Sequence, residues 1–73
     1  MFDLRDKVEY LVIVISEFGR QHGCTFQEAY RYLKQYKGID FLDHSYEVEH
    51  LFSIEDAVDD LTEYCYRRGG AIV

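Results

Sequence analysis

Residues 10–15, with the sequence YLVIVI, constrain the fold more than any other part of this 73-residue chain. One face of a helix needs apolar residues spaced i, i+3, i+4 and i+7. That stripe is already filled by Val8, Leu11, Val12, Ile15 and Phe18. Tyr10, Ile13 and Val14 fall outside it, so a helix here is apolar nearly all round. Such a helix is either central to its own core or covered by a partner.

The residues that flank this segment favour a helix over a buried strand. β-branched residues dominate positions 10–15, which leaves a strand as the alternative. The flanks on both sides are helix formers without a turn signal, and we therefore expect a helix from about Leu4 to His22. Asp3 is its candidate N-cap, and Gly23 supplies the left-handed residue that commonly ends a helix.

A second helix has the clearest start in the chain. Thr25 is followed three residues later by Glu28, which predicts a capping box. The pair Lys37 and Gly38 supplies a cation and a glycine to end it. Its expected apolar stripe consists of Phe26, Ala29, Tyr30, Leu33 and Tyr36.

Two further helices follow. A short one is expected from residue 39 or 40 to residue 44 or 46, and residues 47–52 can continue it or form a loop. Ser53 and Asp56 form a capping pair for the last helix, which ends at two glycines. Its stripe consists of Ile54, Ala57, Val58, Leu61, Tyr64 and Cys65.

These elements predict an all-α fold, a small four-helix bundle with a short third helix, as a single helical domain over residues 1–73. The expected core consists of Leu11, Ile15, Phe18, Tyr30, Leu33, Phe41, Leu42, Val58 and Leu61. A chain of this size buries only about 60% of its unfolded surface, so its stability is marginal without staples or partners.

Charge and cysteine content restrict partners and location. The net charge is −6, which repels polyphosphate and argues against nucleic acid as a partner. The N-terminus does not have the pattern of a signal peptide, and six apolar residues are too few to cross a bilayer, which takes about 20. Cys24 and Cys65 have no metal or redox spacing. We therefore expect a cytoplasmic protein with reduced thiols and no membrane association.

The basic middle of the chain opens one alternative. Arg31, Lys34 and Lys37, followed by a short helix, superficially suggest a helix-turn-helix. The recognition helix would then carry Asp40 and Asp43 and no Arg or Lys, which is the wrong charge for a DNA groove. A small DNA-associated regulator therefore remains the second hypothesis.

Catalysis and metal binding have no convincing residue set. The densest cluster of functional side chains consists of His44, Tyr46, Glu47, Glu49 and His50. The two histidines are six residues apart and fall on different helix faces, so the spacing does not suit a metal site. Tyr46 and His50 can meet one turn apart, either for acid–base chemistry or with the tyrosine in the core and the histidine bonded to backbone. We predict no enzymatic activity, cofactor or metal.

The last helix carries a band of acidic side chains that alternates with its apolar stripe. The band consists of Glu55, Asp56, Asp59, Asp60 and Glu63. It is typical of a solvated face, with a docking surface for a basic partner as the alternative.

Seven tyrosines are more than one small core can hold. Tyrosine is enriched in interfaces because it combines a large contact area with a polar tip. We therefore predict a protein–protein interaction module, self-associating through the first helix or binding another protein. The expected interface consists of Tyr10, Ile13, Val14, Tyr32 and Tyr66.

The chain also resembles a family of short, uncharacterised bacterial helical proteins, common in gut bacteria. The resemblance rests on the opening helix from Val8 to Phe18, on the 22–33 segment, on Phe41-Leu42, and on a last helix beginning IEDAV. The segment Tyr46-x-Val48-x-His50 also matches, although the family pattern favours leucine where this chain has Glu49. The resemblance implies a small helical bundle and, through relatives beside genes for toxins, an antitoxin-like accessory role. It implies no activity or cofactor.

Overall fold

The computed structural model describes residues 4–70, and it is all-helical as predicted. Its helices are α1 (Leu4–His22), α2 (Phe26–Gln35), α3 (Gly38–His44), α4 (Tyr46–Glu49) and α5 (Ile54–Arg67). The first helix has the predicted bounds. Residues 47–52 contain both of the expected alternatives, a helix and a loop. α4 ends within them at Glu49, and a turn then leads to α5.

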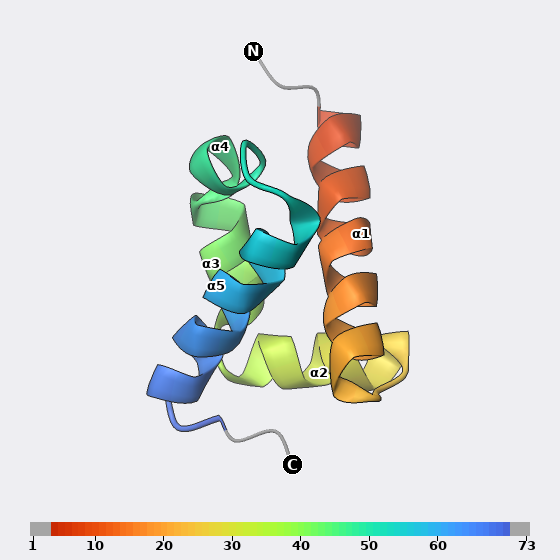
Figure 1. Ribbon diagram of the computed structural model, residues 1–73, viewed down its shortest axis with the longest axis vertical. Coiled ribbons are helices and arrows are strands. Elements are labelled where there is room, and N and C mark those ends of the chain that lie inside the picture. The colour runs from red at the N-terminus through yellow and green to blue at the C-terminus, as the bar shows by residue number, and fades with distance from the viewer. Residues whose placement is uncertain (1–3, 71–73) are drawn as a thin grey trace.

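The helices are not arranged as a simple up-and-down bundle (Figure 1). α1 follows the long axis, and α2 crosses beneath its C-terminal end. α5 lies beside α1 and α3, while α4 packs on α3. The chain turns at Ser45, which makes α4 a separate short helix and gives the described part of the chain five helices where four were predicted.

Two predicted helix starts are confirmed. The Thr25 hydroxyl accepts a hydrogen bond from the Glu28 amide at 3.1 Å, and the Glu28 carboxylate accepts one from the Thr25 amide at 2.9 Å. At the start of α5, the Ser53 hydroxyl accepts from the Asp56 amide at 3.1 Å. These bonds satisfy amides that have no partner within their helix, so each start is fixed locally by its own sequence.

The end of α2 differs from the prediction. Lys37, and not Gly38, adopts the left-handed conformation, with φ of 65°. Gly38 instead begins α3 and is buried. A Cβ atom there would lie 2.8 Å from Leu33 Cδ2 and 2.9 Å from Cys65 Sγ. The glycine is therefore required for close packing of α3 against α2 and α5, not for its φ.

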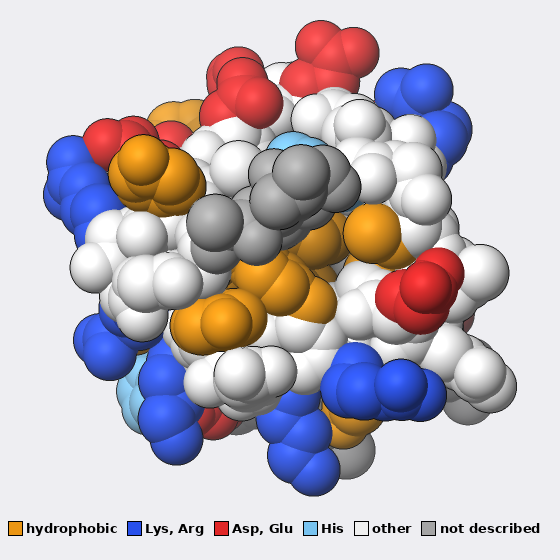
Figure 2. Space-filling model, turned by 90° about the horizontal axis from the view of Figure 1, so that it is seen from below, with side chains coloured by type: hydrophobic (Ala, Val, Ile, Leu, Met, Phe, Trp, Pro, Cys, Tyr) orange, Lys and Arg blue, Asp and Glu red, His pale blue; other side chains and the backbone are white. Residues whose placement is uncertain are grey.

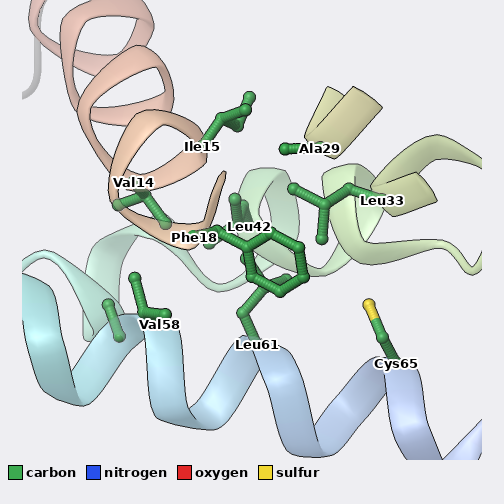
Figure 3. Close-up of a cluster of buried hydrophobic side chains, with 10 residues drawn as sticks. Val14, Ile15, Phe18, Ala29, Leu33, Leu42, Val58, Leu61 and Cys65 are labelled. Carbon is green, nitrogen blue, oxygen red and sulfur yellow. The ribbon is translucent and has the colours of Figure 1, made fainter. Parts of the chain in front are cut away.

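The core lies where α1, α2, α3 and α5 meet (Figure 3). The Phe18 ring occupies its centre and is fully buried. Leu33, Leu42 and Leu61 approach it from three different helices. The remaining members of the cluster are Val14, Ile15, Ala29, Ala57, Val58 and Cys65.

The inner faces of two helices are rotated from the predicted ones. α1 turns Val14 inward and leaves Val8 and Val12 half-exposed. On α2, Tyr32 packs against the core while Tyr30 is 43% exposed, so the placement of Tyr30 in the core is wrong. Each of these helices has apolar residues on two adjacent faces. The packing of the neighbouring helices therefore decides which face is buried.

The tight contact at Gly38 gives a test of the packing. Gly38→Ala improves helix propensity but places a methyl group against Leu33 and Cys65. We expect the free energy of unfolding to fall by about 1–3 kcal/mol, the usual cost of overpacking. Lys37→Gly relieves a left-handed lysine, and we expect no loss of stability from it. Urea unfolding measures both variants, and a Gly38→Ala protein as stable as the wild type would contradict the observed packing.

Candidate functional site

The structure separates the five residues predicted to form an interface. Val14 is fully buried in the core, so its assignment to an interface is wrong: a partner cannot reach it in the folded chain. Tyr32 stacks on Phe18, with ring centroids 5.7 Å apart, and covers the core. Tyr10 is half-buried. Ile13 and Tyr66 are 52% and 70% exposed, but they lie on different helices.

Ile13 belongs to a shallow groove between α1 and the start of α5. The groove has a volume of about 520 Å³. Val12, Ile13 and Ile54 give it an apolar floor, and they come from both helices. Its polar lining consists of Ser16, Glu17, Arg20 and Glu55. The outer face of α1, with Val8 one turn before Val12, continues this apolar surface. We call the groove together with Val8 the α1 surface.

α2 carries a second exposed apolar site with a different charge. Phe26 and Tyr30 are each 43% exposed, and with Gln27, Arg31 and Lys34 they line a groove of about 430 Å³. Figure 2 shows the end of the molecule where α2 lies, with Lys and Arg side chains, and some Asp and Glu side chains, around an apolar centre. Arg31 and Lys34 of this helix are both exposed.

An aromatic cluster joins α1 to α4. The Tyr10 and Tyr46 rings meet edge to face at 5.2 Å, and the Tyr46 and His50 rings stack at 4.9 Å. Tyr46 is buried, and His50 Nδ1 lies 2.7 Å from the Tyr46 carbonyl oxygen. This confirms the structural interpretation of the Tyr46–His50 pair. The Lys7 ammonium lies 5.9 Å from the centre of the Tyr46 ring and forms an ion pair with Asp43 on α3.

Glu49 lies beside this cluster, and its burial was not predicted from the sequence. Its side chain is only 5% exposed, and its Oε1 atom has no hydrogen-bond partner. Burial, together with a hydrogen bond and charge repulsion from Asp60, raises the pKa of Glu49 to about 7. Burial also raises the pKa of Tyr10 to about 12, with Glu49 adding to the effect. The Tyr10 hydroxyl is likewise buried without a partner.

These groups do not assemble into a metal centre. Within residues 4–70, no three His, Cys, Asp or Glu side chains converge closely enough to share a metal ion. His44 Nδ1 lies 2.8 Å from the Asp40 carbonyl oxygen, as expected of a surface histidine bonded to its own helix. Over the same residues, no helix combines the length and the apolar run that a membrane span requires.

Comparison with known proteins gives one match. Residues 9–68 match the model of a family described as "Protein of unknown function (DUF3791)". No curated protein and no solved structure matches the chain. The family match confirms the resemblance to an uncharacterised family, and the match covers α2 to α5 with most of α1.

The buried carboxyl makes stability depend on pH. The pKa of Glu49 rises from 4.5 in the unfolded chain to about 7 in the folded one. Its neutral form therefore contributes stability that is complete below pH 4.5 and is lost as the pH rises through about 7. At about 1.4 kcal/mol per pKa unit, the free energy of unfolding of the wild type should fall by about 2 kcal/mol between pH 5 and pH 8. We expect Glu49→Gln to abolish this fall, because the amide does not ionise.

Urea unfolding at the two pH values measures this effect. Glu47→Gln is the matched control, because Glu47 lies on the same helix but is exposed. It should keep the wild-type dependence on pH. If Glu49→Gln and the wild type lost stability equally between pH 5 and pH 8, Glu49 would be ionised in the folded protein at both.

Proposed function

The chain belongs to the DUF3791 family, whose function is unknown, and we propose that it is a protein–protein interaction module that self-associates through the α1 surface. The observation that carries this proposal is the double face of α1. Its inner side fills the core with Val14, Ile15 and Phe18, while its outer side exposes three large aliphatic residues. A helix that is apolar on both sides lowers its free energy when its outer side is covered.

The exposed residues form a surface and are not scattered. Val8 and Val12 are one helical turn apart, and Val12 and Ile13 line the same groove as Ile54 of α5. Their exposures of 50%, 46% and 52% leave about half of each side chain to bury. Covering them contributes about 1 kcal/mol per side chain. Six such side chains in a symmetric pair offset a part of the cost of association, so a weak dimer is expected.

Charges at the groove support a second copy as the partner. Glu17 and Arg20 pair within α1, and Glu55 lies close enough to favour the charged form of Arg20. A twofold axis through this groove would bring Arg20 of one copy towards Glu55 of the other. The rim therefore offers both signs of charge to an identical surface, as a self-complementary contact requires.

A second candidate function is binding to DNA or to an acidic partner through α2, in a regulator or an antitoxin-like accessory protein. The groove with Phe26, Tyr30, Arg31 and Lys34 favours it, because aromatic rings and cations there are exposed together. The acidic band of α5 weighs against nucleic acid, since Glu55, Asp56, Asp59, Asp60 and Glu63 are all exposed. Self-association remains the preferred function.

We expect Val12→Asp and Ile13→Asp each to shift a concentration-dependent dimer to monomer. Both side chains are half-exposed in the single chain, so the free energy of unfolding of the monomer should change little. Sedimentation velocity over a range of protein concentrations measures the shift. Tyr66→Asp is the matched control, because Tyr66 is 70% exposed but does not line the groove. A wild-type monomer at every concentration would refute the proposal.

Charge reversal tests the symmetry of the contact. Arg20→Glu should weaken the dimer by placing like charges beside Glu55, and adding Glu55→Arg to it should restore the dimer. Failure of the double variant to recover, with its fold intact by circular dichroism, would exclude the pairing of Arg20 with Glu55 across the axis.

The second candidate has its own test. If α2 binds duplex DNA, fluorescence anisotropy at low salt should detect binding that Arg31→Glu together with Lys34→Glu removes. Absence of binding by the wild-type protein at low salt would eliminate it.

A further inference from the structure

A further groove on the described part of the molecule lies away from the α1 surface. It has a volume of about 550 Å³ and is formed by α3, α4 and α5 with the residue after α5. Its lining consists of Phe41, Glu49, Asp60, Glu63, Tyr64, Arg67 and Arg68. None of these residues lines the groove proposed for self-association. We call this second feature the Glu49 pocket.

Glu49 is the buried acid in the lining of the pocket. It is 5% exposed, whereas the charged residues that α5 contributes to the lining are all exposed. A buried acid with an unpartnered oxygen is unusual, because buried polar groups are nearly always hydrogen-bonded. The missing partner is a donor, since a carboxylate oxygen accepts hydrogen bonds.

The cations that line the pocket do not supply that donor. Arg67 donates to Glu63 at 2.5 Å, and the Arg68 guanidinium lies 4.6 Å from the centre of the Tyr64 ring. The ion pairs among the described residues join Lys7 to Asp43, Glu17 to Arg20 and Glu63 to Arg67, and none reaches Glu49 or Asp60. The carboxyls of Glu49 and Asp60 therefore interact with each other and not with a cation of the described residues.

The wall beside these carboxyls is apolar and flat. Phe41 and Tyr64 stack with ring centroids 4.6 Å apart and an interplanar angle of 27°. Such a pair offers contact area to methylene groups, and a carboxyl pair offers two acceptors to a cation. The geometry points to a ligand that combines both: we propose that the Glu49 pocket binds an alkylammonium group, with its nitrogen at Glu49 and Asp60 and its carbon chain on Phe41 and Tyr64.

Two sources can supply this chemistry, a free primary amine or the lysine side chain of a protein. Either carries a compact cation with three donors on an apolar stem. Metal ions do not fit, because the described residues form no cluster of three ligands here. The site does not require the self-association proposed above, and its test is independent of oligomeric state.

Binding should release a proton and therefore depend on pH. Asp60 on α5 acts directly on Glu49, and Glu49 in turn acts on Tyr10 of α1. The other titratable groups that line the pocket are Glu63, Tyr64, Arg67 and Arg68. An ammonium ion takes the place of the proton that Glu49 holds, and Glu49 gives up that proton with a pKa of about 7. The competent form is then about tenfold more populated at pH 8 than at pH 6, and the apparent affinity rises by that factor.

The experiment is an NMR titration of the ¹⁵N-labelled chain with two probes, n-butylammonium and a blocked Gly-Lys-Gly peptide, at pH 6 and pH 8. We expect amide shifts in α4 and in the second half of α5, with about tenfold tighter binding at pH 8. Butyrate is the control probe and should cause none of these shifts. Shifts with butylammonium alone identify a free amine as the source, and shifts with both probes identify a lysine side chain.

Matched variants make the result specific. Glu49→Gln keeps the shape of the side chain and should weaken binding at least tenfold, whereas Glu47→Gln, exposed on the same helix, should bind as the wild type does. Retention of the native amide spectrum shows that each variant is folded. If neither probe shifts α4 and α5 at pH 8, or if Glu49→Gln binds as tightly as the wild type, the proposal is wrong.

Discussion

Every helix of this fold except α4 contributes to the burial of one ring, that of Phe18. Phe18 belongs to α1, and Leu33, Leu42 and Leu61 of α2, α3 and α5 lie with it in one buried cluster. Once Phe18 points inward, the rotation of α1 is fixed: Val14 and Ile15 follow it into the core, and Val12 and Ile13 are left outside. The α1 surface is thus a consequence of core packing in a helix that has apolar residues on all sides.

Much of the fold follows from local sequence signals, and the remainder depends on contacts between helices. The capping residues Thr25 and Ser53 predict two helix starts because they act through neighbouring amides. Rotation is harder to predict, since α1 and α2 each offer two apolar stripes and only the partner helices select one. The role of Gly38 was likewise hidden, because its neighbours Leu33 and Cys65 are brought to it by folding.

The burial of the candidate site residues was predicted with unequal success, because it too depends on contacts between helices. The exposure of Ile13 follows from its position off the main stripe, whereas Val14 occupies a similar position in the sequence and is buried. Glu49 stands among other charged residues in the sequence, and nothing local indicates that folding buries it. Burial of this carboxyl, with Asp60 beside it, is what raises the pKa of Glu49.

The central claim is that α1 uses its two faces for different purposes, the inner one for the core and the outer one for a second copy. Methyl NMR with a soluble paramagnetic probe measures the exposure of Val12, Ile13 and Val14 separately at several protein concentrations. The account predicts Val14 methyls that are protected at every concentration, and Val12 and Ile13 methyls that become protected only as concentration rises. Accessible Val14 methyls in the dilute protein, or Val12 and Ile13 methyls that remain equally accessible throughout, would contradict it.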